Sequence, residues 1–520
     1  MYMHVHCLFA LLWLGNGIQA VLLDAPSYQN FGCRRWPTAT VLGSHVYIEG
    51  GEISQLEDGK NPLVIAPVNS TLSIDISKSW NSKTVSIRTI TKPPGIPSRT
   101  MANIWTNAAA LELYSWGGTF RNAKDIVQAQ VLKFTADGNG GGSWGVQNLE
   151  NANILKTLHP SRGGAFASAN ETGFLIGGQA NNLTELNRKD QQNIPGMLTF
   201  DMKTKTLQNI TSTSSSAGDS DSGFPFNGAL VWAEAEYVPN FGPNGLVMVF
   251  GGHDAPLDNS IEAYDTQPLG FETLRFFDPR TGEWFSQKTT GTAPFTPRMN
   301  FCVTGFQTTS GYDIFVYGGY REQGTKPVFG SSYILSLPGF VWTQVPDAPE
   351  GRQGHACVSV GNRQVLSIGG STYGWATRDK APQGLSLFDM TSLEWKYEYD
   401  ADAGPYERSD RIKEWYKNGS LASVQWSSDK VRTLFAISET SEPVATPGPD
   451  PKSSRTPVGA IVGGVLGGVG VLALIAGIAW WLLRFRRRTS MLMRSLANMD
   501  TQSWLQGDEE QSSQDPRQNL

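Results

Sequence analysis

Short apolar runs, each closed by a pair of glycines, recur along most of the chain. Runs of four or five apolar residues bounded by turn residues are typical of β-strands. Because one pattern recurs at intervals of 51 to 74 residues, the sequence predicts a repeat architecture. The six glycine pairs are Gly50-Gly51, Gly117-Gly118, Gly177-Gly178, Gly251-Gly252, Gly318-Gly319 and Gly369-Gly370.

A second apolar run follows each glycine pair and leads through a turn to an aromatic residue. The clearest copy runs from Phe277-Asp278 through Pro-Arg-Thr-Gly to Trp284. Asp, Pro and Gly are favoured in tight turns, so this copy predicts two strands joined by a turn. The other copies are Asp75 to Trp80, Phe134 to Trp144, Asp201 to Leu207, Phe340 to Trp342, and Asp389 to Trp395.

An arginine opens the apolar run before most of the glycine pairs. The fourth copy has Phe224-Pro-Phe-Asn227 at this place and no arginine. The repeating unit is therefore an arginine, two strands around a Gly-Gly, a turn and an aromatic residue. The five arginines are Arg35, Arg99, Arg162, Arg298 and Arg352.

This order of elements resembles the kelch motif over about residues 30–400. The resemblance implies an all-β fold, a six-bladed kelch β-propeller in which each copy is one four-stranded blade. Residues 401–440 lack a Gly-Gly, and we expect a short helix over 408–417 and a strand over 431–437, so a partial seventh blade stays an alternative. The layout is also similar to the kelch-repeat, cell-wall-anchored-type membrane proteins of filamentous fungi, which implies architecture and no activity.

The two ends of the chain predict a membrane protein with one C-terminal transmembrane helix. Residues 7–14 are apolar and precede Ala20, which indicates a signal peptide over 1–20. Residues 458–483 carry no charge, can span a bilayer as a helix, and are followed by an arginine cluster that begins at Arg484. We therefore expect a single-pass type I protein of the plasma membrane or a secretory-pathway membrane.

The segments around the predicted span have distinct compositions. Residues 441–457 are rich in Ser, Thr and Pro, which predicts an extended stalk between the span and the propeller region, 21–440. Residues 484–520 lack apolar periodicity, and we expect a disordered cytoplasmic tail. Glycines recur every four residues from Gly459, a spacing that favours a homodimer of spans, although small residues that merely fill the span are the alternative.

Five Asn-x-Ser/Thr sequences precede the predicted span, and none follows it. This distribution agrees with a propeller region that passes through the secretory pathway, where such asparagines accept glycans. The predicted glycosylation sites are Asn69, Asn170, Asn182, Asn209 and Asn418.

Composition excludes one class of partner and leaves the cysteines open. The net charge of −5 argues against nucleic-acid binding, which needs a basic face. Cys33, Cys302 and Cys357 remain after the predicted signal peptide, an odd number for an oxidising compartment. Their positions relative to the arginines place Cys302 and Cys357 on opposite faces of their strands, so the disulfide pairing stays unassigned.

Catalytic chemistry has little support in the sequence. Kelch propellers include galactose-oxidase-like copper enzymes, whose site needs two histidines, two tyrosines and a cysteine bonded to one tyrosine. The histidines after residue 20 show no metal-ligand spacing, and no nucleophile with a partner base is visible. We therefore expect no enzyme, no cofactor and no metal site, and a copper radical oxidase is the least favoured alternative.

The arginine set favours a binding function. In kelch propellers that bind acidic peptides, arginines at this repeat position line the binding face, and the resemblance implies the same for the five arginines named above. Guanidinium groups pair with carboxylates, so we expect a protein or glycan ligand at the propeller mouth. Two alternatives stay open: the arginines bind backbone carbonyls within the fold, or the propeller is a structural or adhesion module of the cell surface or wall.

Overall fold

The computed structural model describes residues 24–436, apart from 58–59, 211–223, 227, 258–266, 295, 322–327 and 373–377. The predicted signal peptide, stalk, span and tail lie outside the described residues. Among the described residues, no helix has both the length and the apolar character that a membrane crossing requires. The chain divides into two compact units, Met1–Pro449 and Asp450–Leu520, and the description below concerns the first.

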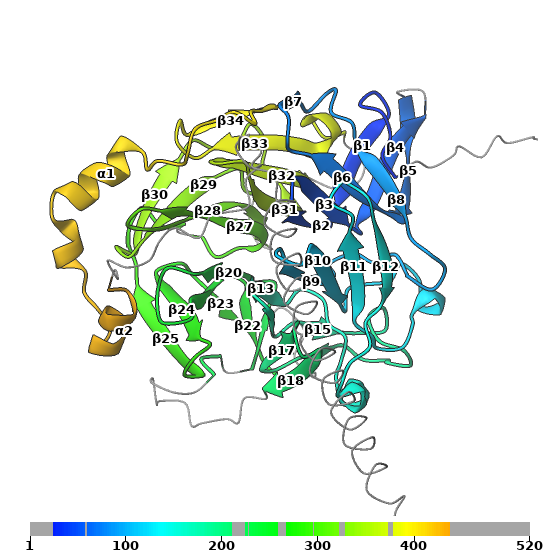
Figure 1. Ribbon diagram of the computed structural model, residues 1–520, viewed down its shortest axis with the longest axis horizontal. Coiled ribbons are helices and arrows are strands. Elements are labelled where there is room, and N and C mark those ends of the chain that lie inside the picture. The colour runs from blue at the N-terminus through cyan, green and yellow to red at the C-terminus, as the bar shows by residue number, and fades with distance from the viewer. Residues whose placement is uncertain are drawn as a thin grey trace, which may run out of the picture. The chain divides into compact units, whose positions relative to one another are not determined.

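Six sheets, counted within the described residues, each contain four antiparallel strands in chain order and lie around a common centre (Figure 1); one of these sheets also includes a short parallel strand, and another includes three further strands. Sheets 1 to 3 comprise β2 (Thr38–Leu42), β3 (His45–Glu49), β6 (Ser70–Asp75) and β8 (Arg88–Thr91); β9 (Asn103–Asn107), β10 (Glu112–Trp116), β11 (Leu132–Ala136) and β12 (Gly142–Val146); and β13 (Ala165–Ala169), β14 (Thr172–Ile176), β17 (Met197–Asp201) and β18 (Thr206–Ile210). Sheets 4 to 6 comprise β20 (Glu234–Val238), β21 (Leu246–Phe250), β24 (Thr273–Asp278) and β25 (Glu283–Lys288); β27 (Met299–Thr308), β28 (Gly311–Tyr320), β29 (Ser332–Leu337) and β30 (Val341–Val345); and β31 (Gln353–Val360), β32 (Gln364–Ser371), β33 (Leu385–Asp389) and β34 (Glu394–Lys396).

Neighbouring sheets contact one another through their first strands, and the contacts close into a ring. The sequence of contacts is β2–β9, β9–β13, β13–β20, β20–β27, β27–β31 and β31–β2. The hydrophobic core is divided accordingly, because one large apolar cluster lies between each pair of adjacent sheets. This arrangement is a β-propeller, and it confirms the all-β fold.

The glycine pairs join each sheet to the next. The N–H of the second glycine donates to a backbone carbonyl that precedes the following sheet, as Gly51 does to Arg99 at 3.0 Å and Gly118 to Ser161 at 3.0 Å. A Cβ atom on Gly50 would lie 2.1 Å from the Arg99 carbonyl oxygen, a distance that no larger residue tolerates. The repeated Gly-Gly is therefore required by the close approach of two backbones.

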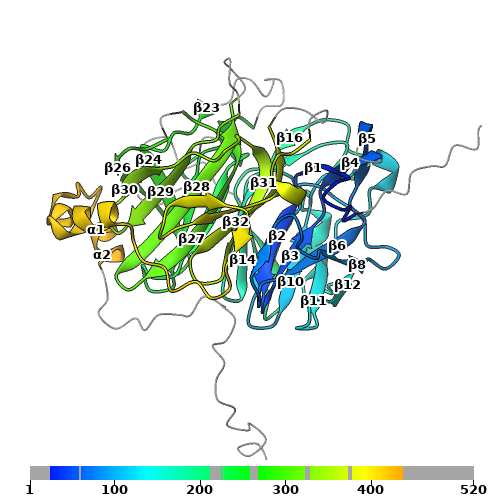
Figure 2. The same ribbon diagram turned by 90° about the horizontal axis from the view of Figure 1, so that it is seen from above.

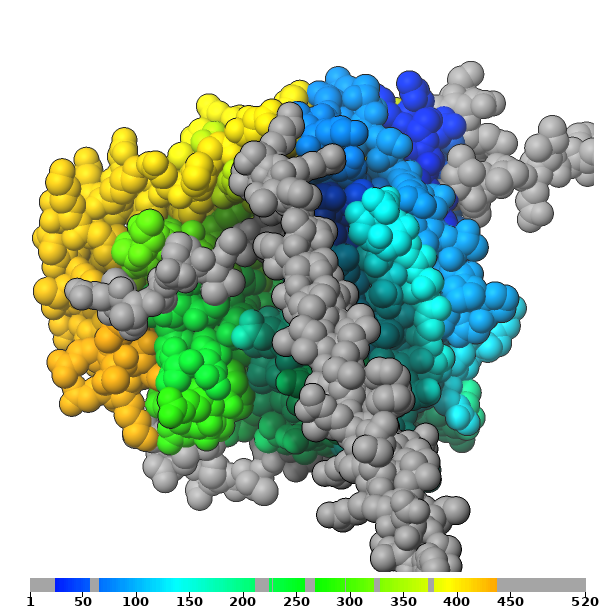
Figure 3. All heavy atoms as spheres, in the orientation of Figure 1, coloured from blue at the N-terminus to red at the C-terminus, as the bar shows by residue number. Residues whose placement is uncertain are grey.

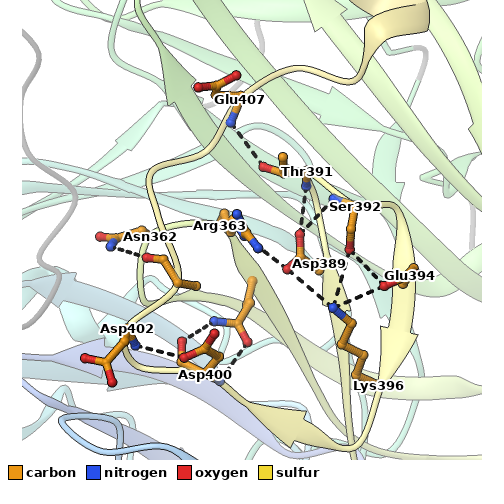
Figure 4. A network of polar contacts seen from close by, with 12 residues as sticks. Asn362, Arg363, Asp389, Thr391, Ser392, Glu394, Lys396, Asp400, Asp402 and Glu407 are labelled. Atoms are coloured by element: carbon orange, nitrogen blue, oxygen red, sulfur yellow. Dashed lines mark hydrogen bonds and ion pairs between the residues drawn. The ribbon is translucent and has the colours of Figure 1, made fainter.

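The aspartates and tryptophans after the third strands also have defined roles. Asp389 accepts hydrogen bonds from the backbone N–H groups of Thr391 at 3.0 Å and Ser392 at 2.9 Å, which shapes the turn between β33 and β34 (Figure 4). Trp144 donates its indole N–H to Thr71 of the preceding sheet at 2.7 Å. Such turns and tryptophans fix the outer edge of a sheet and attach it to its neighbour.

Shorter elements extend the six sheets. β1 (Phe31–Arg35) pairs with β32 of sheet 6 and with β4 (Glu52–Glu57), which pairs with β5 (Lys60–Pro67). Figure 2 shows β4, β5, β16 and β23 on one side of the sheets. The remaining elements are β7 (Trp80–Asn81), β15 (Gln179–Ala180), β16 (Gln192–Asn193), β19 (Ala229–Val231), β22 (His253–Ala255), β23 (Gln267–Pro268), β26 (Thr290–Gly291), β35 (Glu398–Tyr399), η1 (Ala123–Asp125), η2 (Ala152–Lys156), η4 (Pro382–Gly384) and η5 (Ser420–Ser423).

The C-terminal segment of the described chain packs on the outer edge beside sheets 4 and 5 (Figure 3, orange). Helix α1 (Asp410–Lys417) confirms the expected helix over 408–417. The expected strand over 431–437 is wrong, since residues 429–434 form helix α2 (Asp429–Leu434). The Ser428 hydroxyl accepts a hydrogen bond from the Val431 N–H, which caps this helix, and Val431 and Phe435 share one buried face.

Candidate functional site

An axial cavity of about 470 Å³ runs between the first strands of the six sheets. Its walls come from β2, β9, β13, β20, β27 and β31 and from the residues just before these strands. Each sheet therefore contributes one edge to the cavity. A concave site to which every repeat contributes is the natural candidate for a ligand.

One end of the cavity is surrounded by six residues at equivalent positions, which we call the mouth ring. Each lies two positions after the residue whose backbone carbonyl meets the glycine pair of the preceding sheet. Each has a positive φ between 51° and 61°. All six are half-buried and line the cavity. The mouth ring consists of Trp36, Met101, Gly163, Trp232, Asn300 and Gly354.

Backbone hydrogen bonds hold the mouth ring in this unusual conformation. The N–H of Trp36 donates to the Gly354 carbonyl at 2.8 Å, and the N–H of Met101 donates to the Trp36 carbonyl at 3.2 Å. On the opposite side, the N–H of Trp232 donates to the Gly163 carbonyl at 2.6 Å. A positive φ is costly for non-glycine residues and persists only where the surroundings impose it.

The two tryptophans lie against the two glycines of the mouth ring. A Cβ atom on Gly163 would lie 2.4 Å from the Trp232 ring, and one on Gly354 would lie 2.6 Å from the Trp36 ring. The tryptophans precede sheets 1 and 4, so they occupy opposite positions in a ring of six. Each tryptophan ring therefore fits only because the preceding position of the mouth ring is a glycine, which has no side chain.

Arg35 and Arg162 accompany these tryptophans. The Arg35 guanidinium lies 4.1 Å from the Trp36 ring centre, and the Arg162 guanidinium lies 5.3 Å from that of Trp232. Burial is the main cause that lowers the pKa of both arginines below the ordinary value. These two predicted site residues are partly exposed, and each forms a cation–π pair with a tryptophan of the mouth ring.

The other three predicted arginines are buried inside the sheets. Arg99 and Arg298 donate to the carbonyls of Gly117 at 2.7 Å and Gly318 at 2.8 Å, the first glycines of their own sheets, and Arg352 makes the same bond to Gly369. Burial lowers the pKa of Arg99 and of Arg298 to about 10. Burial also opposes the charge of Arg352, but its ion pair with Asp379 raises the pKa above the ordinary value.

The five arginines are therefore neither at equivalent positions nor gathered into one ring, and their part in ligand binding stays a prediction. In sheets 1 and 3, the positions equivalent to Arg99, Arg298 and Arg352 are occupied by Arg34 and Ser161. The backbone carbonyls of these two residues meet the glycine pairs of the preceding sheets. Arg35 and Arg162 come one residue later in the chain and point elsewhere. None of the five is among the described residues that line the axial cavity.

Two glutamates of β20 line the cavity wall instead. Glu234 and Glu236 lie two residues apart and share a face of the strand. Burial raises the pKa of Glu234 to about 8 and is the main cause that raises that of Glu236 to about 7. The Tyr312 hydroxyl donates to Glu236 at 2.7 Å. Sequence reasoning missed this pair, whose only signal was two acidic residues alternating with alanine in an inner strand.

The longer connections of the fold join strand ends that lie at the same end of the propeller as the mouth ring. The second and third strands of each sheet are joined by residues 50–69, 117–131, 177–196, 251–272, 321–331 and 372–384. The first and second strands are joined by much shorter turns, at 43–44, 108–111, 170–171, 239–245, 309–310 and 361–363. Because the strands alternate in direction, the long connections share the end of the propeller that carries the mouth ring. Binding residues concentrate on such loops.

Comparison with known proteins agrees with this architecture. No family model matches the chain. A protein of Arthroderma benhamiae, described as "Kelch repeat-containing protein", is 24% identical over 550 aligned residues, which cover 89% of this chain and 76% of that protein. This similarity supports the predicted relationship to kelch-repeat proteins.

Within this propeller, the predicted glycosylation sites lie at the surface. The side chains of Asn69, Asn170, Asn182, Asn209 and Asn418 are all exposed. Their glycosylation stays a prediction. The cysteine pairing that the sequence left open is resolved, since Cys302 of β27 and Cys357 of β31 form a disulfide between sheets 5 and 6. Cys33 is a buried free thiol, and burial is the main cause that raises its pKa.

Proposed function

We propose that this chain is a binding protein, a six-bladed kelch propeller that takes a segment of a protein partner at the mouth ring. The observation that carries the proposal is the pair of half-buried tryptophans, Trp36 and Trp232, which line the axial cavity from opposite positions of the mouth ring. Tryptophan and arginine are the residue types most enriched at energetic centres of protein interfaces. Each tryptophan here has an arginine on its face.

The mouth ring is also held ready for a ligand. Backbone hydrogen bonds fix the backbone at the two tryptophan positions, and each tryptophan ring packs against a glycine of the mouth ring. A site that is ordered before binding loses less conformational entropy when the partner arrives. The described residues of the long connections start at the same end of the propeller and supply further surface for recognition.

The cavity wall restricts the chemistry of the inserted segment. Below the mouth ring the ionisable groups of β20 are carboxyl groups, Glu234 and Glu236, so the cavity does not favour an acidic side chain. We propose that the partner inserts an apolar side chain between the two tryptophan rings. This replaces the carboxylate-bearing ligand that five converging arginines would favour.

The topology remains part of the proposal. The predicted signal peptide, five surface asparagines and uncharged residues 458–483 support a type I membrane protein whose propeller lies outside the cytoplasm. In that arrangement the partner is an extracellular or lumenal protein. No step of turnover is part of this proposal.

The test is binding of the full-length chain to an array of peptides and glycans. The variant Trp36→Gly/Trp232→Gly gives positions 36 and 232 the residue that the equivalent positions 163 and 354 already carry. Glycine tolerates the positive φ, so we expect the backbone of the mouth ring to be preserved. The matched control is Trp415→Gly on α1, outside the cavity lining. We expect peptide binding to weaken at least 30-fold in the double variant, which corresponds to about 2 kcal/mol, and to stay unchanged in the control.

Other outcomes assign the function differently. Binding to glycans alone, lost in the same double variant, would keep the site and replace the protein partner by a carbohydrate. Equal binding by the wild-type chain and the double variant would move the site away from the mouth ring. No binding to either array would favour a structural or adhesion module.

A further inference from the structure

Three side chains that can bind a metal ion, two cysteines and one histidine, lie together on the wall of the axial cavity between sheets 5 and 6. Cys302 of β27 faces Cys357 of β31, and His355 lies two residues before Cys357 on the same face of that strand. The two sulfur atoms and a ring nitrogen of His355 lie within 4.8 Å of one another. In the described part of the chain, no other group of His, Cys, Asp and Glu residues shows this clustering.

The His355 side chain is buried without a satisfactory partner. Its exposed fraction is 6%, and although the Tyr317 backbone lies near, neither ring nitrogen makes a well-aligned hydrogen bond. The ring packs edge-on against Tyr317, with ring centres 4.9 Å apart. Buried polar groups without partners are rare in folded proteins and call for an explanation. A ligand bond from one ring nitrogen would supply the missing interaction.

We propose that Cys302, Cys357 and His355 bind one divalent cation of borderline softness, such as Zn²⁺, when the disulfide is reduced. Two molecules of a thiol reductant supply two electrons and two protons to the S–S bond and leave as one disulfide. The two cysteine thiols then lose their protons on binding the cation. His355 contributes the lone pair of one ring nitrogen as a neutral imidazole. Two thiolates and one imidazole are a donor set that suits Zn²⁺.

The surroundings fit such a site. Two thiolates neutralise the charge of a divalent cation, so the filled site places no net charge beside the buried Arg352, which is already paired with Asp379. All three ligand residues line the axial cavity, which provides a path for the cation. A fourth position would open on the cavity, as in zinc sites with three protein ligands. The disulfide and the metal are mutually exclusive states of one joint between two sheets.

The test uses Co²⁺ and Zn²⁺ on the full-length chain. The chain is reduced with a phosphine, freed of reductant under argon and titrated with Co²⁺, whose thiolate complexes absorb in the near ultraviolet. We expect one equivalent of Co²⁺, a thiolate-to-cobalt band, and displacement by one equivalent of Zn²⁺. The oxidised chain should show no such band. Cys33→Ser, which removes the third thiol, should behave as the wild-type chain does.

His355→Ala separates this site from simple binding by two thiols. We expect its affinity for Zn²⁺, measured by competition with a chromophoric chelator, to fall at least tenfold. X-ray absorption of the zinc-loaded wild-type chain needs no variant, and we expect two sulfur and at least one nitrogen neighbour. An oxygen-only shell, a thiolate band that Cys33→Ser abolishes, or unchanged affinity in a folded His355→Ala chain would each overturn the proposal. None of these outcomes depends on the mouth ring.

Discussion

Four side chains of the mouth ring stand on a backbone conformation that L-amino acids seldom adopt. Trp36, Met101, Trp232 and Asn300 have φ values between 51° and 59°, where each costs about 1 kcal/mol or more. A protein that needed only a closed ring of sheets could use glycine at all six positions, as it does at Gly163 and Gly354. The repeated backbone geometry with unlike side chains agrees with the proposal that these side chains contact a ligand.

The contact between Gly163 and Trp232 leads to a prediction about stability. Gly163→Ala places a methyl group 2.4 Å from the Trp232 ring on backbone with φ of 61°. We expect it to lower the free energy of unfolding by about 2–3 kcal/mol, measured by denaturant titration. In a Trp232→Gly background the same substitution should cost less than half as much. An equal cost in both backgrounds would show that the ring contact is not the cause.

The two glutamates of the cavity wall predict how stability depends on pH. Their pKa values in the folded chain, about 8 and about 7, exceed the ordinary 4.5, so the folded state binds more protons than the unfolded state between these values. The stability that these two groups contribute should therefore be fully present at pH 4.5 and below and be lost as the pH rises towards 8, by about 1–3 kcal/mol after allowance for water in the cavity.

The variant Glu234→Gln tests the source of that pH dependence. An amide does not ionise, so the decline in unfolding free energy between pH 5 and pH 9 should become shallower. Denaturant unfolding of the wild-type and variant chains at pH 5, 7 and 9 measures the difference. A decline of the same size in both chains would assign the effect to other groups.

At the scale of the structural element, the buried arginines hold the start of a sheet to its own glycine pair. The Arg298 side chain donates to the Gly318 carbonyl, while its backbone carbonyl accepts from Gly252 of the preceding sheet. We expect Arg298→Ala to destabilise the chain by about 2–4 kcal/mol in denaturant unfolding, because it leaves a buried carbonyl unpaired. Arg162→Ala, which removes a partly exposed cation–π pair, should cost less than about 1 kcal/mol.

The C-terminal segment depends on one buried ion pair. Arg408 donates to Asp313 at 2.8 Å and to the Leu337 carbonyl at 2.7 Å, and Asp313 is fully buried. Arg408→Ala leaves that carboxylate without its cation, and we expect a loss of about 3–5 kcal/mol of unfolding free energy. Limited proteolysis should then cleave first between residues 400 and 436. Lys413→Ala, which removes an exposed ion pair with Glu407, is the control and should leave cleavage unchanged.

At the scale of the whole molecule, residues from both ends of the described chain close the ring. β1 joins sheet 6 through β32, and β35 pairs with β7 beside sheet 1. The Cys302–Cys357 disulfide adds a covalent link between sheets 5 and 6. The contacts between the two ends of the described chain therefore lie at the junction of sheets 6 and 1, and the disulfide strengthens the neighbouring junction of sheets 5 and 6.

The sequence predicted the strands, the glycine pairs and the aspartate turns well, because each depends on local backbone conformation. The sequence could not show which arginine of a neighbouring pair is the buried one. Arg34, and not Arg35, is the residue whose carbonyl meets Gly369 of the adjacent sheet, and only the folded structure shows this contact. The disulfide pairing stayed unassigned for a related reason. Side chains on opposite faces of one sheet point away from each other. When two sheets lie next to each other in the ring, a side chain on one face of the first sheet meets a side chain on the opposite face of the second.

The mouth ring itself was hidden from sequence reasoning. Its members share a φ value and a place in the fold, but they share no residue type. Only the closed ring of sheets makes Trp36 and Trp232 equivalent. The glutamates of β20 became recognisable once the axial cavity showed which strand edges face it.

Hydrogen–deuterium exchange of the full-length chain, with and without the ligand selected on the array, tests the central claim most directly. We predict that the ligand slows exchange in the peptides that carry the mouth ring, residues 34–38, 99–103 and 230–234, and leaves the outer strands β8, β12, β18 and β25 unchanged. Protection confined to those outer strands, or to the short turns at the opposite end of the cavity, would contradict binding at the mouth ring.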